Sequence, residues 1–175
     1  TGYYRYDEGY RPSFEGESRF TGQIVHPQDW PSDLDYAGKR IVIIGSGATA
    51  ATLMPALAAQ ADHVTMLQRT PTYIATVPAV DPLADVLRRL LPASRAHSIL
   101  RWKNRMSRQL IYTMSRRKPE MVRAKLRKEA IKQLPAGYDV DTHFNPPYAP
   151  WDQRVCAVPD GDLFTVIREG KASIS

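Results

Sequence analysis

The 175-residue sequence contains only one cysteine, Cys156, so it cannot form an internal disulfide. This scarcity is typical of proteins that fold in a reducing compartment, and we expect a cytoplasmic protein in which Cys156 is a core residue rather than a nucleophile. The sequence also lacks an apolar run of about 18 residues, so no membrane-spanning helix is predicted. Its four histidines show no metal-ligand spacing, and we predict no metal site.

Negative charge is scarce in one part of the sequence. The net charge is +6, but residues 83–133 contain 15 Lys/Arg and only 3 Asp/Glu. Apolar residues recur there at helical spacing, which predicts a basic helical region at residues 81–134. Three helices are expected: one that begins after Asp81 and ends at Pro92, one through residues 99–114, and one from near Pro119 to before Pro135.

The basic faces of these helices have three interpretations. The simplest is a solvated surface. Contact with anionic lipid at the inner face of the cell membrane is the second, because basic amphipathic helices that carry Trp or Tyr bind such surfaces. Nucleic acid is the third and the least favoured, since no known reader module is recognisable, and we expect no nucleic-acid partner.

The strongest local pattern is a strand–turn–helix signature. Residues 41–44 are four consecutive β-branched residues, which predict a strand buried on both faces. The spacing G-x-G-x-x-A follows, allowing a tight turn, close approach of a pyrophosphate and close helix packing. With a helix expected at 48–61 and a second strand from residue 63, the pattern predicts dinucleotide binding, with an ordinary glycine turn as the alternative. The predicted ligands are Gly45, Ser46, Gly47, Ala48, Thr49 and Ala50.

The end of the second predicted strand has no carboxylate. Sites for NAD or FAD usually carry Asp or Glu there to bind the ribose hydroxyls. This sequence has Gln68-Arg69-Thr70 instead. A guanidinium can contact a 2′-phosphate through two charged hydrogen bonds, and a threonine hydroxyl can add another. We therefore predict that Arg69 and Thr70 bind NADP(H), whereas a solvated surface arginine is the alternative interpretation of Arg69.

A second motif precedes the glycine-rich sequence. Residues 20–31 have the pattern F-x-G-x-x-x-H-x-x-x-W-P, defined by Phe20, Gly22, His26, Trp30 and Pro31. Together the two motifs resemble those of Baeyer–Villiger monooxygenases, flavin enzymes that use NADPH and O2. The Trp-Pro ending favours this branch over the related flavin-containing monooxygenases. The resemblance implies a conformational role for His26, whereas a lone histidine near a tryptophan more often makes a structural hydrogen bond.

The resemblance also implies the architecture. It predicts an α/β protein, namely a Rossmann-like NADP-binding domain with a helical insertion, within a flavoprotein that has two dinucleotide-binding domains. Thr1-Gly2 resembles the end of an FAD-domain segment, so FAD is expected to bind mainly to sequence outside this chain, which alone should be inactive. The expected parts are a linker with the motif at 1–38, a βαβ core at 39–80, the insertion at 81–134 and a return to the NADP domain at 135–175.

One arginine is the candidate catalytic residue. The resemblance implies that Arg154, in the sequence Trp151-Asp152-Gln153-Arg154, reaches the flavin and stabilises negative charge that develops during oxygen transfer. A lysine is common at the preceding position. Gln153 replaces it here, so its expected role in cofactor binding is weaker. By the residues alone, Arg154 could equally be a loop arginine paired with Asp152 or Asp160.

These features together predict the NADPH-binding part of an FAD-dependent monooxygenase. The resemblance implies insertion of one oxygen atom from O2 into a ketone, or oxidation of sulfur in a sulfide or thioamide. Two alternatives remain open. One is an NADP-binding reductase module without oxygenation, and the other is a basic fragment that associates with membranes.

Overall fold

The computed structural model describes residue 9 and residues 11–175. The chain divides into two compact units, Thr1–Tyr36 and Ala37–Ser175, and each is described by itself. Thr1 and Gly2, on which the expected link to an FAD domain depends, lie outside the described residues.

The described part of the first unit, residue 9 and residues 11–36, is largely irregular, and two short 3-10 helices interrupt it. These are η1, Glu17–Arg19, and η2, Pro27–Asp29. His26 caps η2, because its Nδ1 accepts a hydrogen bond from the Gln28 N–H at 3.2 Å. The structural role of His26 that the residues suggested is therefore present.

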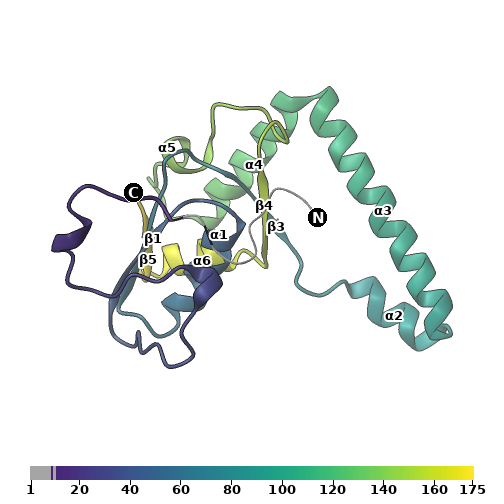
Figure 1. The fold of residues 1–175 in the computed structure, drawn as a ribbon. Coiled ribbons are helices and arrows are strands. Elements are labelled where there is room, and N and C mark those ends of the chain that lie inside the picture. The colour runs from purple at the N-terminus through teal and green to yellow at the C-terminus, as the bar shows by residue number, and fades with distance from the viewer. Residues whose placement is uncertain (1–8, 10) are drawn as a thin grey trace. The chain divides into compact units, whose positions relative to one another are not determined.

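A parallel sheet organises the second unit (Figure 1). Its strands are β1, Arg40–Ile44; β2, His63–Leu67; and β5, Ala172–Ile174, in the order β1-β2-β5. Helix α1, Ala48–Ala58, connects β1 to β2 and ends three residues earlier than expected. The predicted α/β class with parallel strands is confirmed.

This sheet is covered on one face only. Ile43, Val64 and Met66 are buried on the face that α1 contacts. Val42 and Ile44 point to the opposite face and are 62% and 61% exposed. The expectation that this strand is buried on both faces is therefore wrong, because β1 lies at the sheet edge and helices of this unit cover one side only.

A second, two-stranded parallel sheet was not predicted. It pairs β3, Tyr73–Val77, with β4, Val155–Pro159. The sequence of β3 lies between Pro71 and Pro78. A run of only five residues between prolines carries little periodicity, and its partner lies about 80 residues later, so no local pattern joins the two strands.

The three predicted basic helices are all present. They are α2, Pro82–Leu90; α3, Ala93–Arg117; and α4, Pro119–Gln133. Asp81 caps α2 by accepting the Leu83 N–H at 3.1 Å, as expected of an N-cap. In Figure 1, α2 and α3 run beside each other and α4 returns to the sheets.

Two further helices complete the unit. Helix α6, Asp162–Arg168, packs against α1. Helix α5, Val140–Phe144, was not expected; it has only five residues and packs against α4. Phe144 of α5 and Phe164 of α6 are both buried, with ring centroids 5.2 Å apart, so α5 and α6 share one core.

Candidate functional site

The glycine-rich loop lies between β1 and α1. Gly45 has φ 125°, a conformation that favours glycine, and its N–H donates to the carbonyl oxygen of Leu67 at 2.8 Å. Gly47 is the N-cap of α1, where no side chain caps the helix and the first turn carries no carboxylate. The first N–H groups of α1 are thus free of a side-chain acceptor. A Cβ built on Gly45 or Gly47 would meet no atom within 4 Å, so a phosphate group has room to approach this backbone.

Two hydroxyl groups join this loop to Arg154. Ser46, 6% exposed, donates through Oγ to the carbonyl oxygen of Thr70 at 2.8 Å. Thr72, 2% exposed, donates through Oγ1 to the carbonyl oxygen of Ser46 at 2.8 Å. Arg154 donates from Nε to the Thr72 hydroxyl at 3.1 Å and from Nη2 to the Ser46 hydroxyl at 3.5 Å. The guanidinium therefore lies at the edge of the glycine-rich loop.

The alternative pairing of Arg154 does not occur. Asp152 instead forms an ion pair with Arg116 of α3. Asp160 accepts a hydrogen bond from the Ala79 N–H at 3.1 Å. Among the described residues, Arg154 thus has two neutral hydroxyl partners and no carboxylate partner, so its charge is available to an anion.

Arg69 and Gln68 follow the end of β2 and lie in different surroundings. The Arg69 side chain is exposed and has no hydrogen bond or ion pair with any residue that the structure describes. The Gln68 amide nitrogen instead contacts Nδ1 and the carbonyl oxygen of His143, each at 3.2 Å. This contact holds α5 beside the end of β2 and leaves Arg69 free to meet a ligand.

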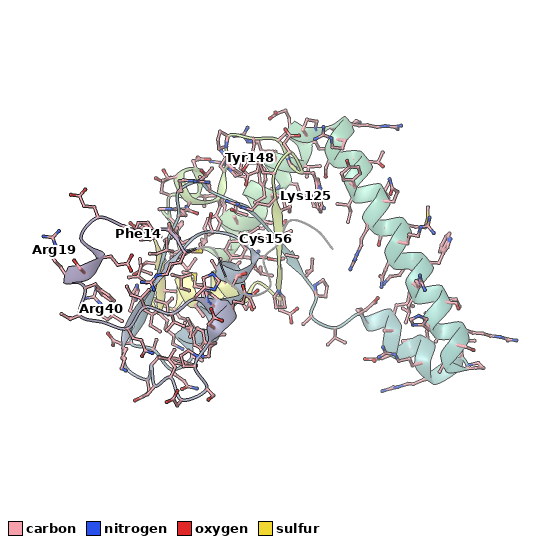
Figure 2. The ribbon with its side chains drawn as sticks, viewed as in Figure 1. Phe14, Arg19, Arg40, Lys125, Tyr148 and Cys156 are labelled. Carbon is pink, nitrogen blue, oxygen red and sulfur yellow. The ribbon has the colours of Figure 1, made fainter. Side chains whose placement is uncertain are left out.

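A hydrogen bond joins the loop before β4 to the loop after β2. Tyr148 donates through its hydroxyl to the carbonyl oxygen of Pro71 at 3.1 Å. Tyr73, almost fully buried at the start of β3, donates to the carbonyl oxygen of Tyr148 at 2.6 Å. Their rings meet edge to face, with centroids 5.5 Å apart. Figure 2 labels Tyr148 on this loop and Cys156 on the strand that follows it.

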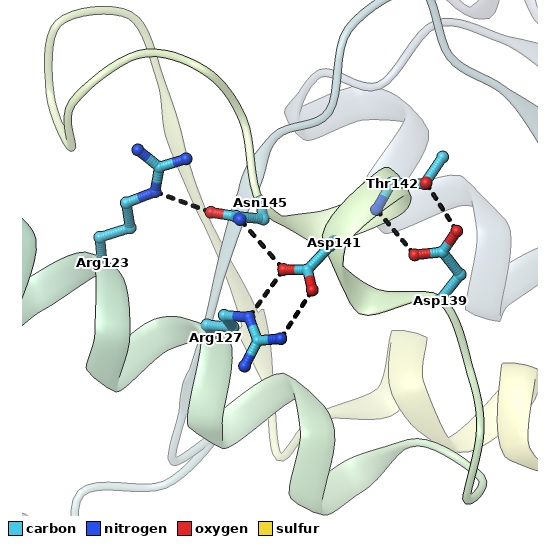
Figure 3. A network of polar contacts seen from close by, with 6 residues as sticks. All are labelled: Arg123, Arg127, Asp139, Asp141, Thr142 and Asn145. Atoms are coloured by element: carbon cyan, nitrogen blue, oxygen red, sulfur yellow. Dashed lines mark hydrogen bonds and ion pairs between the residues drawn. The ribbon is translucent and has the colours of Figure 1, made fainter.

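A polar network attaches α5 to α4 (Figure 3). Arg127 donates from Nε and Nη2 to the two carboxylate oxygens of Asp141, at 2.7 and 2.6 Å. Asn145 donates to Asp141 at 3.0 Å and accepts from Nε of Arg123 at 2.7 Å. Asp139 caps α5 through the N–H and hydroxyl of Thr142. This network fixes the point at which the chain leaves α5 towards Tyr148 and Arg154.

Cys156 is a core residue, as expected. It is free and buried on β4, and burial raises the pKa of its thiol. A thiol that is neutral and inaccessible is a poor nucleophile. No group of three His, Cys, Asp or Glu side chains that could hold a metal ion occurs in the described part of the chain. Within the same residues, no helix is long and apolar enough to cross a membrane.

A model of the flavin-binding monooxygenase-like family matches residues 1–120 of the sequence. The chain belongs to this family. It is 53% identical over 175 residues to the FAD-containing monooxygenase EthA of Mycolicibacterium smegmatis, an alignment that covers 99% of this chain and 36% of EthA. The identity to EthA of Mycobacterium tuberculosis is also 53%, with the same coverage. The chain thus spans little more than a third of the length of these relatives.

Solved structures of low sequence identity share the fold of this flavin-binding monooxygenase-like chain. A steroid monooxygenase bound to NADP has a TM-score of 0.67 and 20% identity, and it is similar over 95% of this chain and 38% of its own. Cyclohexanone monooxygenase from Rhodococcus sp. Phi1, bound to NADP+, has a TM-score of 0.63 and 17% identity over the same shares. The predicted membership of a flavin-monooxygenase family is confirmed.

The family motif of residues 20–31 lies in the first unit. The ring of Phe20 lies over Gly22, where a Cβ would stand 2.5 Å from the ring, so glycine permits this close approach. Trp30 contacts Tyr36 edge to face at 6.3 Å between ring centroids. The first contact explains the Phe20–Gly22 spacing by local packing, whereas Tyr36, the partner of Trp30, lies outside the motif.

The sequence patterns did not identify the residues whose hydrogen bonds hold the predicted site residues in place. Thr72 and Tyr148 were not singled out, although they hold Arg154 and its loop. His143 was considered only as a metal ligand. Each acts through a contact with a residue tens of positions away in sequence, and such contacts leave no local pattern. Gln153, which was predicted to bind the cofactor, is exposed beside Arg154.

Proposed function

We propose that this chain is the NADP(H)-binding part of an FAD-dependent monooxygenase. The observation that carries the proposal is the open glycine-rich loop at the start of α1, whose Ser46 hydroxyl contacts both Arg154 and Thr70, the residue that follows the exposed Arg69. The loop backbone and the N-terminus of α1 would hold the pyrophosphate, because both present N–H groups to an anion. Arg69 and Thr70 would bind the 2′-phosphate and so distinguish NADPH from NADH.

The order of the parallel strands supports this assignment. β1, β2 and β5 are the first, second and third strands of the sheet along the chain, and they lie in the order third-second-first. This is half of the Rossmann strand order, in which dinucleotides bind at the carboxyl ends of the strands. We infer that the chain is a Rossmann-like domain into which α2, α3 and α4 are inserted, and that it is one segment of a longer flavoprotein.

FAD would be bound mainly by sequence outside this segment and would supply the oxygen chemistry when bound. Within this segment, Arg154 would place a permanent positive charge near the reacting atoms. Its hydrogen bonds to Ser46 and Thr72 would couple its position to that of the phosphates held by the same loop. The substrate class that best fits the motif of residues 20–31 is a ketone, as in Baeyer–Villiger oxidation, or alternatively a sulfide or thioamide oxidised at sulfur.

A reductase module without oxygenation is the competing proposal. It would need the same glycine-rich loop and Arg69, but it would have no use for Arg154 beside that loop. The coupling of Arg154 to Ser46 therefore favours the monooxygenase.

The test is the cofactor preference of the protein and of its Arg69→Ala variant, measured by calorimetry. We expect NADPH to bind more tightly than NADH, and Arg69→Ala to weaken NADPH binding by roughly 10- to 100-fold, as loss of a charged hydrogen-bond pair implies. NADH binding should change little. Arg40→Ala is the matched control, because Arg40 is an exposed arginine at the opposite end of the same sheet.

Two results would contradict the proposal. A folded protein that binds both cofactors equally would show that Arg69 does not meet the 2′-phosphate. An FAD-loaded full-length protein that binds neither cofactor would show that the loop is not a dinucleotide site.

A further inference from the structure

The helical region contains a long stretch without any carboxylate. Residues 86–119 include ten Lys or Arg residues and no Asp or Glu. Only three of these cations form ion pairs with described residues, namely Arg88 with Asp85, Lys103 with Asp81 and Arg116 with Asp152. Most of this positive charge is therefore not neutralised within the described part of the chain.

Helices α2 and α3 form an antiparallel hairpin in which α2 packs along only part of the length of α3. Ala84 of α2 and Ala96 of α3 are buried where the two helices meet. Lys103 pairs with Asp81 at the start of α2, so α2 reaches no further along α3 than about this position. Beyond it, no other element of the second unit lies beside the middle of α3 (Figure 1), and side chains extend from this part of the helix in the view of Figure 2.

Large apolar side chains are exposed along this hairpin. On α3, Trp102, Met106 and Leu110 follow one another at four-residue steps, so they share one side of the helix. Trp102 is 67% exposed and Leu110 is 61% exposed. On α2, Leu90 is 73% exposed. An exposed apolar row of this length is unusual for a surface that faces only water.

Basic residues occupy the other side of α3. Arg101, Arg105 and Arg108 recur at four- and three-residue steps and form a stripe beside the apolar row, centred roughly 130° around the helix from it. Helices of this kind lie in the interface of a bilayer, with the apolar side among the acyl chains and the cations at the headgroups. Tryptophan favours this depth, because its ring is apolar while its N–H can be solvated.

We propose that the α2–α3 hairpin docks on a bilayer that contains anionic lipid. The partner of this surface must carry negative charge for the arginines and an apolar region into which the apolar row can insert. A nucleic acid would use the arginines but would leave Leu90, Met106 and Leu110 in water. In an anionic bilayer, the headgroups would pair with the arginines of α3 while the acyl chains cover its apolar row. This proposal is independent of the NADP(H) assignment, because none of its residues lies at the glycine-rich loop.

The experiment uses the full-length, FAD-loaded protein and vesicles of phosphatidylcholine with or without 30% phosphatidylglycerol. Sedimentation measures partitioning, and brominated lipid quenches tryptophan fluorescence in a variant that keeps only Trp102. We expect binding that requires phosphatidylglycerol, weakens with salt, and quenches Trp102. Arg105→Gln/Arg108→Gln should weaken partitioning by about 30-fold, since each cation near the surface contributes about fivefold. Trp102→Ala/Leu110→Ala should weaken it also.

Matched controls carry the same chemical changes on α4. They are Lys125→Gln/Lys128→Gln for charge and Met121→Ala/Ile131→Ala for apolar surface, all exposed positions. Both controls should bind like the unmodified protein.

Four outcomes would overturn the proposal. They are absence of vesicle binding, equal binding to neutral vesicles, binding that the hairpin variants leave unchanged, and hairpin variants that dissociate an oligomer without altering vesicle binding. The last would assign the apolar row to a second copy of the chain. Salt-sensitive binding to RNA or DNA together with absence of vesicle binding would assign the cations to nucleic acid.

Discussion

Hydrogen bonds to neutral groups position the side chain of Arg154. Among the described residues, its guanidinium contacts the hydroxyls of Thr72 and Ser46 and no carboxylate. A carboxylate partner would neutralise the charge and hold the side chain away from an anion. Hydroxyl partners orient the guanidinium without neutralising its charge. A residue that stabilises developing negative charge requires both properties.

Two tyrosine hydroxyls provide a residue-scale prediction. The Tyr73 hydroxyl donates to the carbonyl oxygen of Tyr148 at 2.6 Å. The Tyr138 hydroxyl is buried without a hydrogen-bond partner among the described residues, and burial raises the pKa of Tyr138 to about 12. Tyr73→Phe should lower the free energy of unfolding by about 1 kcal/mol, whereas Tyr138→Phe should leave it unchanged or raise it. Urea unfolding of the two variants measures the difference.

The two variants control for each other, because both remove one hydroxyl from a tyrosine packed in the same unit. Equal losses of stability would mean that Tyr138 has a partner, and the interpretation of its hydroxyl would be wrong.

At the scale of elements, the contact between α4 and α5 depends on ionised carboxylates. Hydrogen bonds from Arg127 lower the pKa of Asp141, and hydrogen bonds from Thr142 lower the pKa of Asp139. A carboxyl group whose pKa is lower in the folded state adds stability above its unfolded pKa, near 3.8. That stability is lost as the pH falls through the folded-state pKa.

We therefore expect the stability of the protein to fall in acid partly through α5. Asp141→Asn should lower stability at neutral pH and make its decline below about pH 4 shallower, because the variant has no carboxylate to protonate there. Urea unfolding at a series of pH values measures the slope. Asp62→Asn, a change at an exposed loop carboxylate, should keep the slope of the unmodified protein. An unchanged slope in Asp141→Asn would show that this ion pair does not contribute to acid unfolding.

The elements that could be predicted from sequence are those with local signals. Asp81-Pro82 and Pro119 mark helix starts, and α2 and α4 begin there. The glycine-rich loop carries its own spacing. In contrast, β3 and β4 are stabilised by pairing between distant segments, and α5 has only five residues whose position depends on Arg127 and Gln68. Ser46, Arg69 and Arg154 could thus be proposed as site residues from local patterns and the resemblance, and their roles stay predictions. The contacts of Thr72, His143 and Tyr148 join residues far apart in the sequence and could not be proposed in this way.

For the molecule as a whole, the uncovered face of the three-stranded sheet is the main departure from expectation. A doubly wound sheet has helices on both faces. Here Val42, Ile44 and Leu67 are exposed on the face opposite α1. The curated relatives are nearly three times as long as this chain, so the proposed longer flavoprotein has ample sequence to cover this face.

This gives a prediction that differs between the isolated chain and the longer protein. In the isolated chain, Val42→Thr/Ile44→Thr should reduce self-association, because threonine keeps the β-branched shape that suits a strand while removing apolar surface from water. Light scattering after size-exclusion chromatography measures this. In the longer protein the same pair should lower the free energy of unfolding by roughly 1 kcal/mol or more per site, since a hydroxyl would then be buried in an apolar contact. Ile43→Thr, on the face covered by α1, should destabilise both forms. An isolated chain that is already monomeric at high concentration would contradict the first expectation. If Val42→Thr/Ile44→Thr leaves the free energy of unfolding of the longer protein unchanged, this face of the sheet stays in water there as well.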